Sequence, residues 1–327
     1  MLGELRMQDK VVILGGELAL EGRELLEAAG IGIISTPPYL GRQKVLEVMA
    51  RVKPVAVVVR QIADTLGPDE MKSGGRLMHI AKHGVGTNDI DVAAAAALGI
   101  PVSITTGSNG HSVAEHALML IMALLKDAVR QDRLIRDGVW DKNQYHGREL
   151  RGQHLAIIGF GFIGQTLARM VAPLGMKISA FDPHTPESAF RDGVARETDL
   201  DRLIGEADVI SLHCPLTEET RNLIDARRIA LMKPSAYLVN TARGEVVDEE
   251  ALIAALRDCR IAGAGLDSFA IEPPAFDNPL FSLPNTLVSP HVAGVTLDAK
   301  RAMSVMAAEN ILSTLRHEEL APRCLAR

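Results

Sequence analysis

The chain has 327 residues, of which 47% are hydrophobic, 23% are charged and only 3% are aromatic. This length suits two domains, and the composition is ordinary for a globular protein whose cores are built from aliphatic side chains. The net charge of −6 and the lack of any block of Lys and Arg argue against binding to nucleic acid or to an anionic membrane surface.

Targeting and membrane-spanning segments are not evident in the sequence. The longest apolar run, residues 117–125, is too short to cross a bilayer, and the first ten residues do not resemble a signal peptide. The cysteines are odd in number and widely spaced at Cys214, Cys259 and Cys324, which favours reduced thiols over a disulfide framework or a metal site. We therefore expect a cytoplasmic protein.

The first hundred residues alternate short apolar runs with helical stretches. The runs predicted as strands are residues 11–14, 31–34, 55–59, 77–80 and 102–104, and the predicted helices are residues 20–29, 43–51, 68–73 and 89–98. Short, continuously apolar strands are typical of a parallel sheet that is buried on both faces. The pattern predicts a small α/β domain.

A single long helix follows Gly107-Ser-Asn-Gly110, and we expect it to occupy about residues 111–137. A second alternating series begins at residue 154. Its predicted strands are residues 155–158, 177–181, 209–212, 236–239, 262–266 and 286–289. Six strands of this kind match a complete doubly wound dinucleotide domain.

The last predicted helix, about residues 297–316, has no strand left to follow, so we expect it to return to the first domain. The predicted fold is α/β with two doubly wound parallel sheets. A Rossmann-type domain, residues 107–297, is inserted in a smaller flavodoxin-like domain that consists of residues 1–106 and 298–327.

A glycine motif marks the start of the second series. Gly159, Gly161 and Gly164 form G-x-G-x-x-G directly after the apolar run 155–158 and before an amphipathic stretch. This arrangement suits a dinucleotide pyrophosphate at a helix N-terminus. The next predicted strand ends at Asp182, 23 positions after Gly159, where a carboxylate accepts ribose hydroxyls and repels the 2′-phosphate of NADP. The motif predicts an NAD site, although glycines also form βαβ turns that bind no nucleotide.

Three chemically reactive residues follow the later strands: Arg243, Glu272 and His291. An arginine can hold the carboxylate and carbonyl of a 2-oxo acid, and a histidine can exchange a proton near neutral pH. A carboxylate bonded to that histidine would favour its charged form, and Asp267 is placed to orient the nicotinamide carboxamide. Each residue alone could be structural, but together at consecutive strand ends they favour hydride transfer.

Several stretches then reveal a family resemblance. They are residues 83–91, 113–115, 138–140, 149–152, 213–217, 240–248, 267–273 and 290–291, together with the glycine motif. The chain resembles the D-isomer-specific 2-hydroxyacid dehydrogenases over about residues 55–315, and most of all their 3-phosphoglycerate dehydrogenase branch. The resemblance implies catalytic roles for Arg243, Glu272 and His291 in an enzyme that interconverts a D-2-hydroxy acid and its 2-oxo acid.

The resemblance also implies further contacts. Those expected with NAD are Phe162, Ile163, His213, Cys214, Pro215, Thr241, Ala242 and Gly294, and those expected with the substrate are Arg60, His83, Gly84, Val85, Gly86 and Asn109. The Gly84–Gly86 segment could equally be an ordinary turn. The family is usually dimeric, so we expect a homodimer formed through the Rossmann domain and the 111–137 helix.

The identity of the substrate stays open at this point. Arg60 and Lys142 resemble phosphate contacts of the phosphoglycerate branch but could equally be surface charges, and His111 stands where the family often has Arg or Lys. Glyoxylate or hydroxypyruvate is the alternative substrate, and an NAD(H)-sensing binding protein of the corepressor type is the alternative from another class. His79 and His83 lie four residues apart but on a strand-to-loop passage without an evident third ligand, so we expect no metal.

Overall fold

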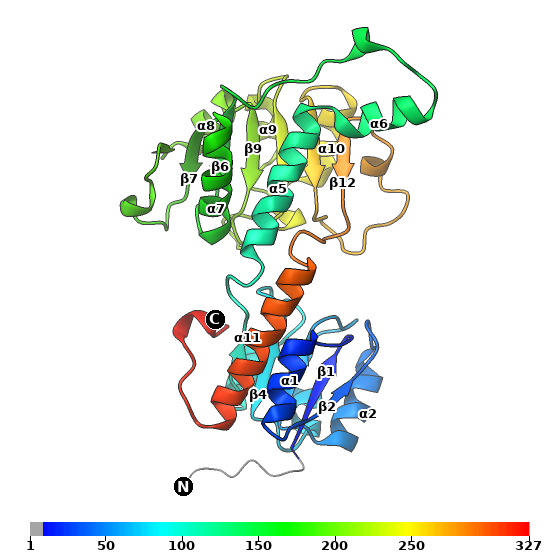
Figure 1. Cartoon of the computed structure of the whole chain (residues 1–327), viewed down its shortest axis with the longest axis vertical. Coiled ribbons are helices and arrows are strands. Elements are labelled where there is room, and N and C mark those ends of the chain that lie inside the picture. The colour runs from blue at the N-terminus through cyan, green and yellow to red at the C-terminus, as the bar shows by residue number, and fades with distance from the viewer. Residues whose placement is uncertain (1–8, 327) are drawn as a thin grey trace. The chain divides into compact units, whose positions relative to one another are not determined.

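The computed structural model describes residues 9–326, which divide into two compact units. One unit contains the chain up to Asn109 and again from Val295, and the other contains Gly110–Gly294. The expected domain boundaries lie three residues away from these junctions. Each unit has one parallel sheet with helices packed against it (Figure 1).

The first unit is built on a five-stranded sheet in the order β2-β1-β3-β4-β5, which is the flavodoxin-like order. Its strands are β1 Lys10–Leu14, β2 Gly32–Ser35, β3 Ala56–Val59, β4 His79–Lys82 and β5 Val102–Ser103. Its helices are α1 Leu20–Ala28, α2 Arg42–Val52, α3 Pro68–Ser73, α4 Val92–Ala97 and α11 Leu297–Leu315, with a short 3-10 turn at Pro322–Cys324. All four residues of β3 are buried, as expected for a central strand covered on both faces.

Helix α11 belongs to the first unit although it follows the whole of the second in sequence. It packs against α1 and β4, and Figure 1 shows its orange ribbon beside both. The approach to α1 is close, because a Cβ at Gly22 would lie 2.5 Å from the carbonyl oxygen of Ser304. The Ser304 hydroxyl also accepts a hydrogen bond from the Ala19 N–H group at 2.9 Å, just before α1 begins.

The second unit has a seven-stranded parallel sheet in the order β12-β11-β10-β9-β6-β7-β8. Its strands are β6 His154–Ile158, β7 Lys177–Phe181, β8 Val194–Arg196, β9 Val209–Leu212, β10 Tyr237–Asn240, β11 Gly263–Leu266 and β12 Thr286–Val288. Its helices are α5 Gly110–Leu125, α6 Ala128–Arg136, α7 Phe162–Val171, α8 Leu200–Glu206, α9 Ala226–Leu231 and α10 Glu249–Arg257. Six of these strands have the Rossmann order, and the order reverses between β6 and β9, where ligands bind in such sheets.

Two predictions for this unit are wrong in detail. The expected single helix is interrupted after Leu125, because Asp127 adopts a left-handed backbone with φ of +49° and α6 then begins at Ala128. Aspartate tolerates this conformation better than most residues do. Strand β8 was not predicted, because it has three residues, lies at the edge of the sheet and offers only Val194 as a strongly apolar residue.

The fourth strand of the first unit is also displaced from its prediction. The apolar run suggested residues 77–80, whereas β4 is His79–Lys82. Lys82 can end a buried strand because its ammonium group pairs with Asp89. The strand therefore extends two residues past the apolar run, because the polar side chain at its end has a partner.

Candidate active site

The turn after β6 is shaped by its glycines. Gly159 has φ of +90°, and a Cβ there would lie 2.5 Å from the backbone nitrogen of Cys214. Gly164 is equally restricted, since a Cβ would lie 2.4 Å from the carbonyl oxygen of Gly159. A Cβ at Gly161, the N-cap of α7, would meet nothing within 4 Å. The turn thus leaves open space beside a helix N-terminus, which is where a pyrophosphate binds.

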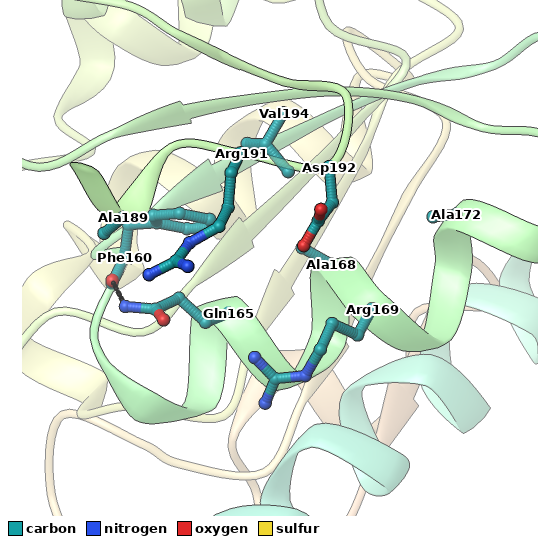
Figure 2. A pocket seen from close by; sticks show the side chains of 9 residues that line it. All are labelled: Phe160, Gln165, Ala168, Arg169, Ala172, Ala189, Arg191, Asp192 and Val194. Atoms are coloured by element: carbon teal, nitrogen blue, oxygen red, sulfur yellow. Dashed lines mark hydrogen bonds between the residues drawn. The ribbon is translucent and has the colours of Figure 1, made fainter. Parts of the chain in front are cut away.

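Phe160 and Gln165 hold this turn against α7. The Phe160 ring stacks on Phe190 with the ring centroids 4.9 Å apart. The Gln165 side chain donates a hydrogen bond of 2.9 Å to the Phe160 carbonyl oxygen, as Figure 2 shows. Phe160 and Gln165 also line a cavity of about 250 Å³ between α7 and residues 189–194. Its lining does not include Gly161 or Asp182.

Asp182 stands at the end of β7 beside the glycine turn. Its Oδ2 atom accepts a hydrogen bond from the Phe160 N–H group at 2.8 Å, and its Oδ1 atom accepts from the His184 and Thr185 N–H groups at 2.8 and 3.0 Å. Burial raises the pKa of Asp182, but these donors outweigh burial, so its pKa is held below the usual value. A fixed negative charge therefore faces the site.

A second cavity, of about 770 Å³, adjoins this carboxylate. It is lined by Gly159, Asp182, Pro183, Cys214 and Pro215, among others. Its volume is within the range of small-molecule sites, and one wall carries the Asp182 charge. The cavity and the glycine turn together fit a dinucleotide, with the adenosine half beside Asp182.

The end of β9 contributes backbone to the site rather than reactive side chains. The His213 N–H group donates to the Ile158 carbonyl oxygen at 2.7 Å, and its ring Nε2 atom lies 2.8 Å from the Ser211 hydroxyl. Burial lowers the pKa of His213 to about 4 and raises the pKa of Cys214 to about 11. Both side chains are therefore neutral at pH 7, and Cys214 is not an activated nucleophile.

The turn after β10 carries Arg243. The buried Asn240 side chain shapes this turn: its oxygen accepts from the Ala242 N–H group at 2.9 Å, and its amide donates to the Arg243 carbonyl oxygen at 2.9 Å. Gly244 then touches the next strand end so closely that a Cβ would lie 1.9 Å from the Phe269 carbonyl carbon. The Arg243 guanidinium donates one hydrogen bond to the Ala242 carbonyl oxygen at 2.7 Å, which leaves other donors for a ligand.

Glu272 and His291 form a pair, although they come from different strand ends. The Glu272 Oε2 atom lies 2.6 Å from Nδ1 of His291, and its Oε1 atom accepts from the Phe269 N–H group at 3.0 Å. The hydrogen bond from Glu272 raises the pKa of His291 above its ordinary value. Burial raises the pKa of Glu272, but its hydrogen bonds with His291 and Phe269 outweigh burial and lower it overall. Since Nδ1 faces Glu272, the Nε2 proton of His291 is free for a ligand.

Asp267 contacts the loop that carries His291, here called the His291 loop (residues 289–293). One carboxylate oxygen accepts from the Ser289 hydroxyl at 2.6 Å and from the Val292 N–H group at 2.9 Å, and the other accepts from the Ala293 N–H group at 2.8 Å. His116 of α5 lies 2.9 Å from the Ser289 hydroxyl. Sequence reasoning gave His116 and Ser289 no role, and the available signal was a histidine on the apolar face of α5.

The Gly84–Gly86 segment of the first unit follows β4. Gly84 has φ of +143°, and its N–H group donates to the Thr105 hydroxyl at 3.0 Å. The N–H groups of Val85 and Gly86 have no acceptor within the described part of the chain, and Val85 is 43% exposed. Two adjacent free donors of this kind can bind a carboxylate.

Arg60 and His83 lie near this segment, and each makes one side-chain hydrogen bond. Arg60 donates to the Glu17 carbonyl oxygen, while its Nε atom is buried without a partner in the described residues, and burial lowers its pKa. His83 lies 3.0 Å from the Ser304 hydroxyl through Nε2. Burial, together with the positive charge of Arg60, lowers the pKa of His83 to about 4, so the ring is neutral at pH 7.

The remaining expected residues differ in how fully they are engaged. Thr241 is buried with no partner for its hydroxyl among residues 9–326, and Phe162 is 56% exposed at the start of α7. Asn109 is the last residue of the first unit before the chain enters the second, and Gly294 is the last residue of the second unit. Lys142 places its ammonium nitrogen 5.9 Å from the centre of the Trp140 ring.

His79 does not take part in a site with His83. Its two ring nitrogens lie 2.8 Å from the hydroxyls of Ser103 and Thr314, and burial lowers its pKa to about 3. Residues 9–326 contain no group of three or more His, Cys, Asp or Glu side chains arranged to hold a metal. Within the same range, every helix is too short or too polar to span a membrane.

Known proteins share both the sequence and the architecture of this chain. Residues 118–293 match the family described as D-isomer specific 2-hydroxyacid dehydrogenase, NAD binding domain. Hydroxypyruvate reductase of Thermotoga maritima is 40% identical over 271 residues, which cover 82% of this chain and 88% of that protein. D-3-phosphoglycerate dehydrogenase of Methanocaldococcus jannaschii is 37% identical over 289 residues, which cover 88% of this chain and 54% of that one.

The fold of this chain is also similar to that of a solved structure with bound NAD. NAD-dependent formate dehydrogenase of Staphylococcus aureus in complex with NAD has a TM-score of 0.84 at 28% identity, and the match covers 97% of this chain and 99% of that one. The predicted family, the two parallel-sheet α/β domains and NAD as cofactor are confirmed. The chain belongs to the D-isomer-specific 2-hydroxyacid dehydrogenases and is an NAD-dependent enzyme that interconverts a D-2-hydroxy acid and its 2-oxo acid.

Proposed function

We propose that this enzyme reduces a small unphosphorylated 2-oxo acid, with hydroxypyruvate as its substrate. The observation that carries the chemistry is the 2.6 Å contact between Glu272 and His291. It raises the pKa of the imidazole, which favours the charged form, and it leaves the Nε2 proton available. The similarity to hydroxypyruvate reductase supports the choice of substrate.

Each step has a residue suited to it. The cofactor, when bound, would supply a hydride for the carbonyl carbon. His291 gives its Nε2 proton to the carbonyl oxygen, so that an alcohol forms and the imidazole becomes neutral. Arg243 would hold the carbonyl and the carboxylate through its remaining N–H groups. In the first unit, the free N–H groups of Val85 and Gly86 suit a carboxylate.

The cofactor residues divide by position along the dinucleotide. Gly159, Gly161 and Gly164, with the first turn of α7 at Phe162 and Ile163, suit the pyrophosphate, while Asp182 suits the adenosine ribose. The nicotinamide half is assigned to the later strand ends. Those residues are His213, Cys214, Pro215, Thr241, Ala242, Asp267 and Gly294.

The cations near the Gly84–Gly86 segment favour an unphosphorylated substrate. Lys82 is paired with Asp89, and Arg60 already donates to the Glu17 carbonyl oxygen. A phosphate dianion usually requires several charge-assisted donors. The second candidate is 3-phosphohydroxypyruvate, which is favoured by the unpartnered Nε atom of Arg60.

A substrate panel with NADH and NADPH tests this choice. We expect the highest kcat/KM with hydroxypyruvate, lower values with glyoxylate and little turnover of 3-phosphohydroxypyruvate. The Arg60→Ala variant should then change the KM for hydroxypyruvate by less than about threefold, which corresponds to under about 0.7 kcal/mol. Preferred turnover of the phosphorylated acid, with a KM that rises strongly in Arg60→Ala, would establish the second candidate instead. Failure of every 2-oxo acid while NADH still binds would refute the proposal and favour a cofactor-sensing role.

We also propose that the enzyme is a homodimer that uses α5, α6 and the segment after them. Large apolar side chains are exposed there: Met119, Met122, Val129, Ile135 and Trp140 are 43–78% exposed. Apolar side chains gathered in this way are typical of a subunit interface. Light scattering should give twice the monomer mass, and a Met122→Lys, Val129→Asp double variant should give the monomer mass. A monomeric wild-type protein at micromolar concentration would contradict the proposal.

A cytoplasmic location completes the proposal. It is supported by Cys214 and Cys324, which are buried as free thiols, and by Cys259, which is exposed and free. Free thiols are usual in a reducing compartment. Fractionation of cells that express the protein should recover it with cytoplasmic markers, and recovery in a secreted fraction would overturn this assignment.

A further inference from the structure

The His291 loop is fixed on both sides of His291 by hydrogen bonds to its backbone. Before it, the Ser289 N–H group donates to the Leu266 carbonyl oxygen at 2.9 Å. After it, the N–H groups of Val292 and Ala293 both donate to the Asp267 carboxylate. His291 itself has φ of +52°, which is uncommon for a residue other than glycine and persists where the surroundings hold it.

A chain of hydrogen bonds continues from this carboxylate into α5. Asp267 is 1% exposed, and as a carboxylate it can only accept, so the Ser289 hydroxyl must donate its proton across the 2.6 Å contact. The Ser289 oxygen is then free to accept from His116, which lies 2.9 Å away through Nε2. The geometry therefore places a proton on Nε2 of His116. The same Nε2 atom lies 3.6 Å from Asp267.

Helix α5 is a firm support for His116. The nearby residues Ala114, Ala117 and Leu120 are buried in one core cluster, and the helix packs directly on β10 and β11. At β11 the contact is close, since a Cβ at Gly265 would lie 3.2 Å from side-chain atoms of Leu120 and Leu124. A side chain on this helix can therefore fix the position of the loops that follow the strands.

We propose that His116 is a positioning residue for the reaction: through Ser289 and Asp267 it holds the His291 loop so that His291 faces Glu272. His116 does not touch the reacting atoms in this proposal. It donates a hydrogen bond to the Ser289 oxygen, so that the Ser289 hydroxyl points its proton toward Asp267. The Asp267 carboxylate then stays bonded to the N–H groups of Val292 and Ala293. The proposal rests on the proposed role of His291 as the proton donor.

Four variants test the proposal. His116→Leu and Ser289→Ala break the chain at its two outer members, the double variant removes both, and His116→Gln restores a donor to the Ser289 oxygen. His154→Leu is the matched control, because His154 makes an equivalent 2.9 Å contact with the Ser179 hydroxyl at the opposite, amino-terminal end of β6. It removes a histidine–serine hydrogen bond without touching the His291 loop.

The expected result is a loss of rate rather than of binding. His116→Leu and Ser289→Ala should each lower kcat by about tenfold or more, because small displacements of a proton donor are costly to the rate. The double variant should be no worse than the poorer single variant, His116→Gln should recover most of the rate, and NADH affinity should stay within about twofold. His154→Leu should leave kcat near that of the wild type.

A readout independent of turnover is the titration of His291 followed by NMR. If His116 positions the loop, His116→Leu should weaken the Glu272 contact, and the pKa of His291 should fall toward its ordinary value, with recovery in His116→Gln. The proposal is overturned if the pKa of His291 is unmoved, if the losses in kcat multiply in the double variant, or if His154→Leu is as damaging. A shifted pKa in a protein that turns over no 2-oxo acid would refute the proposed function and leave the coupling intact.

Discussion

Replacing Glu272 by Gln should slow the reduction and move its pH dependence. Gln is nearly the same size, but its single oxygen replaces only one of the two oxygens that accept from His291 and Phe269, so the change removes the negative charge and one acceptor. In the wild-type enzyme the hydrogen bond with Glu272 raises the pKa of His291. Without that charge the pKa of His291 should fall, and less of the imidazolium that donates the proton remains at neutral pH.

The size of the effect follows from the exposure of the pair. A hydrogen bond between charged groups contributes about 1.5–3 kcal/mol. The side chains of His291 and Glu272 are 45% and 35% exposed, so solvent screens the interaction and the lower part of this range applies. A loss of about 1.5–2 kcal/mol at the transition state corresponds to a roughly 10- to 30-fold fall in kcat.

The assay is the pH profile of kcat/KM for NADH-dependent reduction of hydroxypyruvate. Reduction needs protonated His291, so activity is retained at low pH and lost as pH rises through the pKa of His291. In Glu272→Gln this basic limb should move to lower pH. Oxidation needs the neutral ring, so its acidic limb should move in the same direction. A basic limb that stays in place, or a variant with the rate of the wild type, would refute the assigned role of the pair.

Three other substitutions extend the reasoning. Asp182→Ala should raise the ratio of NADPH to NADH kcat/KM by about tenfold or more, since it removes the charge that opposes a 2′-phosphate, and an unchanged ratio would contradict this assignment. Gly244→Ala should lower the free energy of unfolding in urea by at least about 2 kcal/mol, because its Cβ would lie 1.9 Å from the Phe269 backbone. Gly205→Ala in α8 is the control and should be neutral or stabilising, because the nearest atom to its Cβ is 3.7 Å away. His291→Ala should reduce kcat by about 10²-fold or more with NADH affinity near normal in a fluorescence titration, and a large loss of affinity would mark the residue as structural.

Much of the fold could be predicted because a parallel strand that is buried on both faces consists mainly of consecutive apolar residues. The run at residues 209–212 coincides with β9, whose four residues are all buried. Features that depend on single residues could not be predicted in this way. The break at Asp127 depends on one left-handed residue, and β8 depends on an exposed edge that needs few apolar side chains.

The candidate site shows the same contrast between local and distant signals. The glycine turn and Asp182 could be predicted because their spacing along the chain is set by one strand–turn–helix unit. The pairing of Glu272 with His291 followed from the order of strand ends in a doubly wound sheet, and the structure places them 2.6 Å apart. The contact between His116 and Ser289 joins residues 173 positions apart, and the sequence carries no spacing rule for such a pair.

The two carboxylates beside His291 differ in what their surroundings leave them to do. Asp267 is 1% exposed and accepts from the Ser289 hydroxyl and two loop N–H groups, so three of its four lone-pair positions are filled. Its charge is therefore committed to the backbone of the His291 loop, and one position on Oδ2 remains for the nicotinamide carboxamide expected from the sequence. Glu272 accepts from one backbone N–H group and from His291, and its side chain is 35% exposed. Its charge is thus free to set the protonation of the imidazole. Asp267 therefore holds the loop that carries His291, and Glu272 raises the pKa of the His291 ring.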